Sequence, residues 1–279
     1  MSNENTLGEW GETAKYWTRH RHTIRTMFAP LTRALIEQAG IIREQRVLDV
    51  AGGAGEPSLT IAETVGPEGS VMCTDPIAEM IAAAEVDARD RRLTNVQFRQ
   101  CAADAVPFED GVFDVVVCRL GAMFFPDPLA ALQEMLRVTK PGGRVALVVW
   151  HKSEVNPFCY LITNVVSRHV DSPPADPNAP NAFRFAEEGK LAHILENAGA
   201  TNVVDRVVKF DLAAPISAEE FWTMRSETSE TLRTKLRSFS GEQRNQIGDE
   251  VKAAVQEFFP GGHMNFPTQM IILTGTKPH

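Results

Sequence analysis

The sequence predicts an α/β fold in which a mostly parallel β-sheet carries helices on both faces. Between residues 40 and 150, short apolar runs of strand length alternate with segments of helical periodicity. The short runs are almost continuously apolar, which is typical of strands buried on both faces of a sheet. Turn-forming stretches separate elements, as in "KPGG" at residues 140–143, where we expect a break between a helix and a strand.

The elements of this region are predicted in order along the chain. Five apolar segments have the composition of buried strands: residues 46–50, 70–74, 95–100, 113–118 and 144–150. Three segments with helical spacing lie between them: residues 57–65, 76–89 and 128–138. Pro57 suits the first turn of the first helix, because its fixed φ matches a helix start. The alternation of strand and helix favours parallel pairing.

The C-terminal part is less regular. We expect a Pro- and Asn-rich insert at 152–183 with a helix near 157–169, then a helix at 186–198 and a strand at 201–210. Two or three helices follow. Two of them have capping-box spacing at their starts, in Ser217 with Glu220 and in Ser240 with Gln243. A last apolar strand at 270–276 closes a single sheet, so residues 1–279 are predicted to form one domain with helical insertions.

Composition limits the function classes. The 279 residues carry 28 basic and 36 acidic side chains, a net charge of −8 that argues against a nucleic-acid partner. The four cysteines form no CxxC pair, as expected of buried thiols in a reducing compartment. The first residues lack a signal-peptide pattern, and no apolar run has membrane-spanning length. We therefore expect a cytoplasmic protein that binds no membrane; a homodimer is left open.

A glycine-rich turn, "VLDVAGGAGE" at residues 47–56, points to a ligand. It leaves a predicted strand and enters a helix, which places free N–H groups at a helix N-terminus. Asp75 ends the next strand, 20 residues after Gly55, as an acid that holds ribose hydroxyls would. Ser58 breaks the dinucleotide glycine pattern and no Gly-Lys-Ser/Thr follows. The acids Asp49 and Glu56 favour a cationic ligand over a pyrophosphate.

Four motifs in order resemble the class I S-adenosylmethionine-dependent methyltransferases, specifically the ubiquinone/menaquinone-biosynthesis (methyltransferase type 11) group, over residues 40–150. They are "LDVAGGAG", "TDPIAEM", "AADAVPF" and "FDVVVCRLGAMFF" followed by "LQEMLRVTKPGGRV". The resemblance implies a Rossmann-like fold with a seven-stranded sheet whose last strand is antiparallel. It also implies a cofactor, S-adenosylmethionine, lying across the carboxyl ends of the strands, where the strand order reverses.

The resemblance also implies a set of cofactor-binding residues: Asp49, Ala51, Gly52, Gly53, Gly55, Asp75, Pro76, Met80, Asp104, Ala105 and Arg119. In this set, Asp75 matches the ribose-binding acid, Met80 packs near the adenine, and Asp104 with Ala105 lies at the adenine edge. Asp49 would orient the turn and the methionine end of the cofactor. Arg119 departs from the small polar residue that is common there.

The reaction implied is transfer of a methyl group to a small organic acceptor. The residues expected to contact the acceptor are aromatic: Tyr16, Trp17, Phe124, Trp150 and Trp222. They suggest an apolar or aromatic acceptor. Residues 8–33 are expected to form a lid, and the insertions at 152–183 and 211–262 to form acceptor walls, because specificity commonly lies in segments added to a rigid scaffold.

The chemistry leaves alternatives open. The candidates by type for a general base are His20, His22, His151 and His263, and none is assigned. No spacing of Cys, His and carboxylates resembles a metal site. A methyltransferase-like domain that binds the cofactor without methyl transfer is one alternative. An NAD-dependent oxidoreductase is the other, disfavoured by Ser58 and Asp49.

Overall fold

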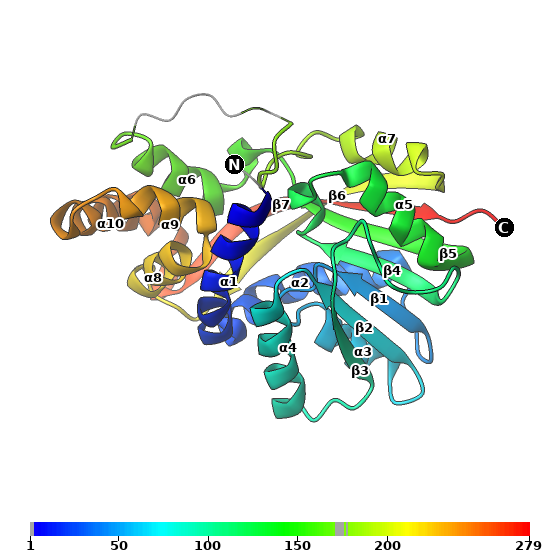
Figure 1. The fold of residues 1–279 in the computed structure, drawn as a ribbon. Helices are drawn as coiled ribbons and strands as arrows, with labels where there is room; N and C mark the ends of the chain where they lie inside the picture. Colours follow the sequence, from blue (N-terminus) through cyan, green and yellow to red (C-terminus); the bar gives the residue numbers. More distant parts are fainter. Residues whose placement is uncertain (1–2, 171–175, 177) are drawn as a thin grey trace.

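The structure is a computed structural model that describes residues 3–170, 176 and 178–279. Its central feature is one seven-stranded sheet with the strand order β3-β2-β1-β4-β5-β7-β6 (Figure 1). The strands are β1 Arg46–Val50, β2 Ser70–Asp75, β3 Val96–Gln100, β4 Phe113–Arg119, β5 Thr139–Trp150, β6 Thr201–Ala214 and β7 Met264–Thr276. Only β7 runs against its neighbours, β5 and β6. The predicted fold class is therefore confirmed, including the antiparallel last strand.

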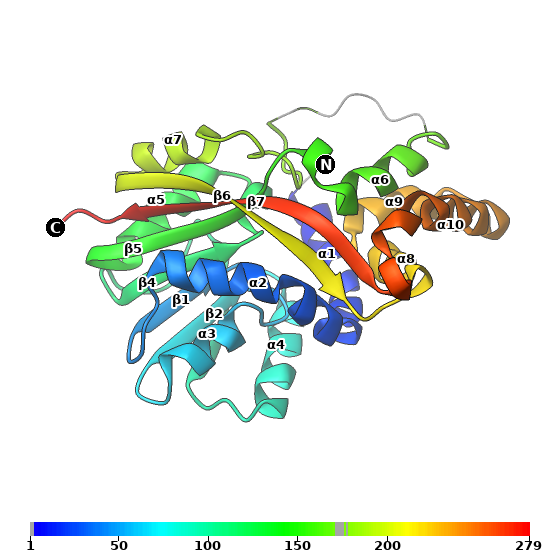
Figure 2. The same cartoon turned by 180° about the vertical axis from the view of Figure 1, so that it is seen from behind.

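Helices cover both faces of the sheet, as the apolar strands predict. Those on one face include α2, Arg21–Ala39, and α3, Ser58–Val65; those on the other include α5, Pro128–Val138, and α7, Lys190–Asn197 (Figures 1 and 2). A further helix, α4 (Ala78–Asp90), packs along β2 and β3. In β1 the side chains of Val47, Leu48 and Val50 are at most 1% exposed, because the sheet is covered on both sides.

The remaining helices form what we call the cap, which gathers at one end of the sheet (Figure 1). Its members are α1 Asn3–Arg19, α6 Pro157–Val166, α8 Ala218–Thr228, α9 Glu230–Arg237 and α10 Gly241–Val255. Short 3₁₀ segments connect other elements: η1 Ala122–Phe124, η2 Ser153–Val155, η3 Gln256–Phe258 and η4 Pro260–Gly262. Both predicted capping boxes are confirmed, at Ser217 before α8 and at Ser240 before α10.

The cap has an aromatic core of its own. Phe221 of α8 stacks on Phe266 of β7, with ring centroids 5.1 Å apart, and Phe158 of α6 meets both rings edge-on. Phe258 and Phe259 complete the cluster against Phe266. This packing ties α6 and α8 to the far end of the long strand β7, so the cap is fixed to the sheet by apolar contacts.

Three strand boundaries differ by several residues from the sequence prediction. The segment "KPGG" lies inside β5 rather than before it, and the pairing with β4 shifts register between Phe113 and Val115. Backbone hydrogen bonds from Gly142 N–H to the Lys277 carbonyl and from Lys277 N–H to the Gly143 carbonyl keep this segment in the sheet. In addition, β7 begins at Met264 rather than at 270, and β6 extends to Ala214, because the two strands pair with each other along that whole length.

Two other expectations concern the Pro- and Asn-rich insert and membrane-spanning segments. Part of the Pro- and Asn-rich insert, residues 171–175 and 177, lies outside them. None of the helices within the described part of the chain is long and apolar enough to cross a bilayer. The assignment of residues 8–33, 152–183 and 211–262 to a lid and to acceptor walls stays a prediction.

Candidate functional site

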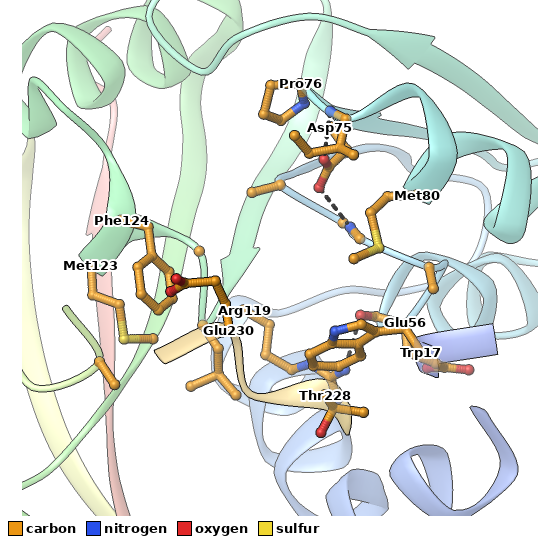
Figure 3. Close-up of a pocket in the computed structure, with 18 of the residues that line it drawn as sticks. Trp17, Glu56, Asp75, Pro76, Met80, Arg119, Met123, Phe124, Thr228 and Glu230 are labelled. Carbon is orange, nitrogen blue, oxygen red and sulfur yellow. Dashed lines mark hydrogen bonds between the residues drawn. The ribbon is translucent and has the colours of Figure 1, made fainter. Parts of the chain in front are cut away.

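A cavity of about 400 Å³ lies where the carboxyl ends of the strands meet the cap (Figure 3). The sheet contributes the turn after β1 and the ends of β2, β4 and β5, and the cap contributes residues of α1, α6, α8 and α9. In sequence order the strands run outward from β1 to β3 and then return to β4 on the other side of β1. Ligands of open α/β sheets bind at such a reversal, next to the carboxyl ends of the strands.

The glycines of the turn after β1 have different roles. Gly53 lines the cavity with φ +56°, and a Cβ placed there would meet nothing within 4 Å. A Cβ on Gly52 would lie 2.6 Å from Cys73 Sγ and 2.9 Å from Asp49 Oδ2. Gly55 does not line the cavity; its φ is +109° and it packs against Leu59. Gly53 thus keeps space open for a ligand, whereas Gly52 and Gly55 allow the turn itself to pack.

Asp75, at the end of β2, fixes the conformation of this turn. Its Oδ2 accepts a hydrogen bond of 3.0 Å from Gly53 N–H, and its Oδ1 accepts one of 2.9 Å from Ile77 N–H. The residue is 7% exposed and lines the cavity. Burial raises the pKa of its carboxyl to about 6, and the two backbone donors oppose that rise. Each carboxylate oxygen has a second lone pair, so Asp75 can still accept hydroxyl donors from a ligand.

Asp49 lies behind the turn and does not line the cavity. Its side chain is fully buried, and its Oδ2 accepts a hydrogen bond of 2.5 Å from Ser58 Oγ at the start of α3. Burial raises the pKa of Asp49 to about 7, the Ser58 hydroxyl opposing. Asp49 therefore links β1 to α3. Because it does not reach the cavity, it could influence the methionine end of the cofactor only through the conformation of the turn.

Arg119, at the end of β4, joins three parts of the site. Its guanidinium donates hydrogen bonds of 2.9 Å to Thr32 Oγ1 of α2 and to the carbonyl oxygen of Glu56 in the turn. The group also lies over the Phe28 ring, 5.3 Å from its centroid. The Glu56 carboxylate is engaged elsewhere, 2.5 Å from Arg91 Nη1. Arg119 lines the cavity, and its two hydrogen bonds hold α2 against the turn, while its buried Nε–H has no acceptor.

The predicted cofactor residues fall into two groups. Those that line the cavity are Ala51, Gly52, Gly53, Asp75, Pro76, Met80, Asp104 and Arg119. Those that do not are Asp49, Gly55 and Ala105. Figure 3 shows Asp75, Pro76 and Met80 on one side of the cavity, opposite Met123 and Phe124. A polar edge near the turn thus faces an apolar wall.

The predicted acceptor residues are also divided. Trp17, Phe124 and Trp150 line the cavity, whereas Tyr16 and Trp222 do not. Lys15, Arg19 and Arg233 lie near the Tyr16 ring instead. Trp222 packs on α10, where a Cβ on Gly248 would come within 2.6 Å of its Nε1. For these two aromatics the structure does not support a place in the acceptor wall, because each points from its helix toward a neighbouring helix.

Several lining residues were not foreseen as site residues. The α2 helix contributes Ile24, Met27 and Phe28, whose helical spacing is visible in the sequence. The C-terminal end of α8 and the start of α9 contribute a polar group with no motif to mark it: Arg225, Thr228, Ser229, Glu230 and Thr231. Only the packing of the cap against the sheet brings these residues to the cavity.

No histidine lines the cavity among the residues that the structure describes. His20 Nε2 lies 2.7 Å from Glu227 Oε2, and His151 Nε2 lies 3.7 Å from Glu188 Oε1. The histidines considered as general bases therefore sit outside this space. Likewise, no group of three or more His, Cys, Asp or Glu with metal-site geometry occurs within the described ranges.

Comparison with known proteins places this geometry in context. Residues 29–164, just under half of the chain, match the ubiE/COQ5 methyltransferase family. A ubiquinone/menaquinone biosynthesis C-methyltransferase, UbiE of Idiomarina loihiensis, is 38% identical over 121 residues, which are 43% of this chain and 48% of UbiE. An uncharacterized protein of Mycobacterium tuberculosis is 40% identical over 124 residues, 44% of either chain. The chain thus spans about half the length of the curated relatives that it matches.

Solved structures match over a longer stretch. The YcgJ protein of Bacillus subtilis, at 22% identity, covers 93% of this chain and 100% of its own length with a TM-score of 0.55. A SAM-dependent methyltransferase of Aquifex aeolicus, at 26% identity, covers 63% of this chain and 82% of its own length with a TM-score of 0.50. These structures share the fold of the sheet and its helices.

Proposed function

We propose that this chain is an S-adenosylmethionine-dependent methyltransferase that acts on a small apolar or aromatic acceptor, because residues 29–164 match the ubiE/COQ5 methyltransferase family. One observation carries the proposal. The carboxylate of Asp75 and the open, glycine-lined turn at Gly53 lie side by side at one end of a cavity whose opposite wall is apolar. Such a cavity could bind a nucleoside at its polar end and an apolar acceptor along its opposite wall.

The residues present fit the proposed cofactor. The Asp75 carboxylate would accept hydrogen bonds from the ribose hydroxyls, and Gly53 leaves room for the ligand to approach the backbone. Pro76 and Met80 would give the adenine ring an apolar face, and Asp104 lines the same cavity. When bound, the cofactor would supply an activated methyl group on a sulfonium.

The protein's remaining contribution is alignment and the exclusion of water. The cavity's apolar wall includes Met123, Phe124, Trp150 and Phe158, which would hold an apolar acceptor body beside the cofactor site. Trp17 of α1 lines the same space, which supports the proposal that α1 is part of a lid. Closing such a space raises the effective concentration of the reacting atoms and keeps water away from them.

Titration calorimetry tests cofactor binding. S-adenosylmethionine and S-adenosylhomocysteine are expected to bind and NAD is not, and Asp75→Ala should weaken binding roughly tenfold or more through loss of charge-assisted hydrogen bonds. Binding of NAD alone would overturn the proposal. With S-adenosylmethionine labelled in its methyl group, transfer of label to a small acceptor distinguishes a methyltransferase from a domain that only binds the cofactor.

A further inference from the structure

A partly buried arginine of the cap, Arg225, lines the cavity and has no ion-pair partner among the described residues. It sits on α8, one turn before the helix ends at Thr228, and it lines the cavity together with Met224 and Thr228. Its guanidinium carbon lies 4.5 Å from the centroid of the Phe158 ring. The neighbouring lining residue Cys159 is itself buried. Arg225 is therefore held against an apolar surface.

No carboxylate of the described residues lies within ion-pairing distance of Arg225. Glu227, two residues further along α8, binds Arg19, and Asp87 of the cavity wall binds Arg21. Glu230 also lines the cavity but forms no ion pair with Arg225. The Nε–H of Arg225 is buried and has no acceptor. Burial lowers the pKa of the guanidinium, yet an arginine stays charged in a protein.

A charged group that is partly withdrawn from water without a partner is costly to a folded protein, because the lost hydration is not replaced. The other two arginines of the cavity wall also have a buried Nε–H without a hydrogen-bond acceptor, but their guanidinium groups have other partners. Arg21 Nε lies 3.4 Å from Asp87 Oδ1, and Arg119 is hydrogen bonded to Thr32 and to the Glu56 carbonyl. Among the arginines of the described lining, Arg225 is thus the one with neither an ion pair nor a side-chain hydrogen bond, so it is the cation that we expect a ligand to bind.

The surroundings define the kind of ligand. The Phe158 ring lies against Arg225, and the cavity that both residues line also presents the side chains of Met123, Phe124, Trp150 and Met224. Such walls suit an apolar body, and a planar guanidinium suits two oxygens of a carboxylate or a similar anionic group. A neutral apolar molecule would leave the charge uncompensated, and a small inorganic anion would leave the apolar walls unfilled.

We propose that Arg225 binds an anionic group on the acceptor, so that the acceptor is an apolar organic acid held by its charged end against α8. This inference rests on the proposed function only in that it identifies the bound anion as the methyl acceptor. The preference for an apolar anion is a property of the cavity itself. Arg225 is on this account a binding residue for the acceptor and not for the cofactor.

Two fluorescent probes with the same rings test the preference. One is 8-anilinonaphthalene-1-sulfonate, an anion, and the other is 1-anilinonaphthalene, which lacks the sulfonate. The wild type should bind the anion more tightly than the neutral probe. Arg225→Met should remove most of that preference, weakening the anion roughly tenfold or more and the neutral probe by less than threefold. Arg225→Lys should keep part of the preference, because it keeps the charge.

The matched control is Arg206→Met, which removes a charge from an exposed position on β6 that does not line the cavity. This variant should bind both probes like the wild type. No preference for the anion in the wild type, or an undiminished preference in a folded Arg225→Met, would overturn the inference. Calorimetry with S-adenosylhomocysteine on the same samples keeps the two proposals apart: failure of that binding contradicts the proposed function, whatever the probes show.

Discussion

At the scale of single residues, the residues of the turn after β1 have different roles. Gly53 faces the cavity and Gly52 faces Cys73 and Asp49. The Asp75 carboxylate accepts a hydrogen bond from Gly53 N–H and so fixes the turn. Ala51, in the same turn, has φ 56°, a conformation that is uncommon for a residue with a side chain. The unusual backbone is thus concentrated where we expect a ligand to approach.

The first prediction contrasts two adjacent glycines. Gly53→Ala should leave the free energy of unfolding lower by only about 1 kcal/mol, the cost of a left-handed conformation, because its Cβ enters open space. That Cβ would stand in the ligand's path, so affinity for S-adenosylhomocysteine should fall sharply. Gly52→Ala should instead destabilise the fold, since its Cβ would overlap Cys73 Sγ. Urea denaturation and calorimetry on both variants check this, and full cofactor affinity in Gly53→Ala would place the ligand elsewhere.

The second prediction concerns the charge on Asp75, whose pKa burial raises to about 6. The ionised carboxylate accepts hydroxyl donors, whereas protonation converts one oxygen to a donor. Affinity for S-adenosylhomocysteine should therefore be constant above pH 7 and decline as the pH falls through 6. In Asp75→Asn the affinity should be lower at pH 7 and should lose that decline. Calorimetry from pH 5 to pH 8 measures both, and an identical pH profile in the two proteins would contradict the role of Asp75.

At the scale of elements, periodicity and capping predict most of the helices and strands. The remaining boundaries depend on contacts with neighbouring elements. The helix at 128–138 has the bounds that its spacing predicts, and the two capping boxes fix the starts of α8 and α10. The extension of β7 back to Met264 was not predictable, because it depends on pairing with β6 over that length.

The candidate site shows the same limit. The motifs in the sheet mark Gly53 and Asp75, since strand ends of a parallel sheet share one edge. The direction of a side chain on a cap helix depends on the partner helix, so Trp17 and Tyr16 could not be told apart by sequence. Arg225 was invisible for the same reason: its significance lies in lacking a carboxylate neighbour, which a sequence does not reveal.

The third prediction uses these two neighbours on α1. Trp17 lines the cavity and Tyr16 does not. Trp17→Ala should weaken binding of ligand in the cavity about tenfold or more, because an aromatic surface that a ligand covers contributes on the order of 2 kcal/mol. Tyr16→Ala should change that binding less than twofold. Binding of 1-anilinonaphthalene and of S-adenosylhomocysteine gives the comparison, and equal losses in the two variants would refute a distinct role for Trp17.

At the scale of the whole molecule, the cavity is a product of two parts. The sheet places the glycine turn and Asp75 at the point where strand order reverses, and the cap supplies Trp17, Phe158 and Arg225 to the same cavity. The match to the ubiE/COQ5 methyltransferase family ends at residue 164, before α8, α9 and α10 begin. The glycine turn and Asp75 thus lie in the part that matches relatives, whereas Arg225 lies outside it, so we expect residues of α8 and α9 to contribute to acceptor specificity.

The most direct test of this account is a crystal structure of the chain grown with S-adenosylhomocysteine. The ribose hydroxyls should lie within hydrogen-bond distance of the Asp75 carboxylate, with the chain of the ligand passing Gly53 and the apolar wall at Phe124 and Phe158 left free for an acceptor. Density for the ligand outside this cavity, or in it with the ribose turned away from Asp75, would contradict the central claim.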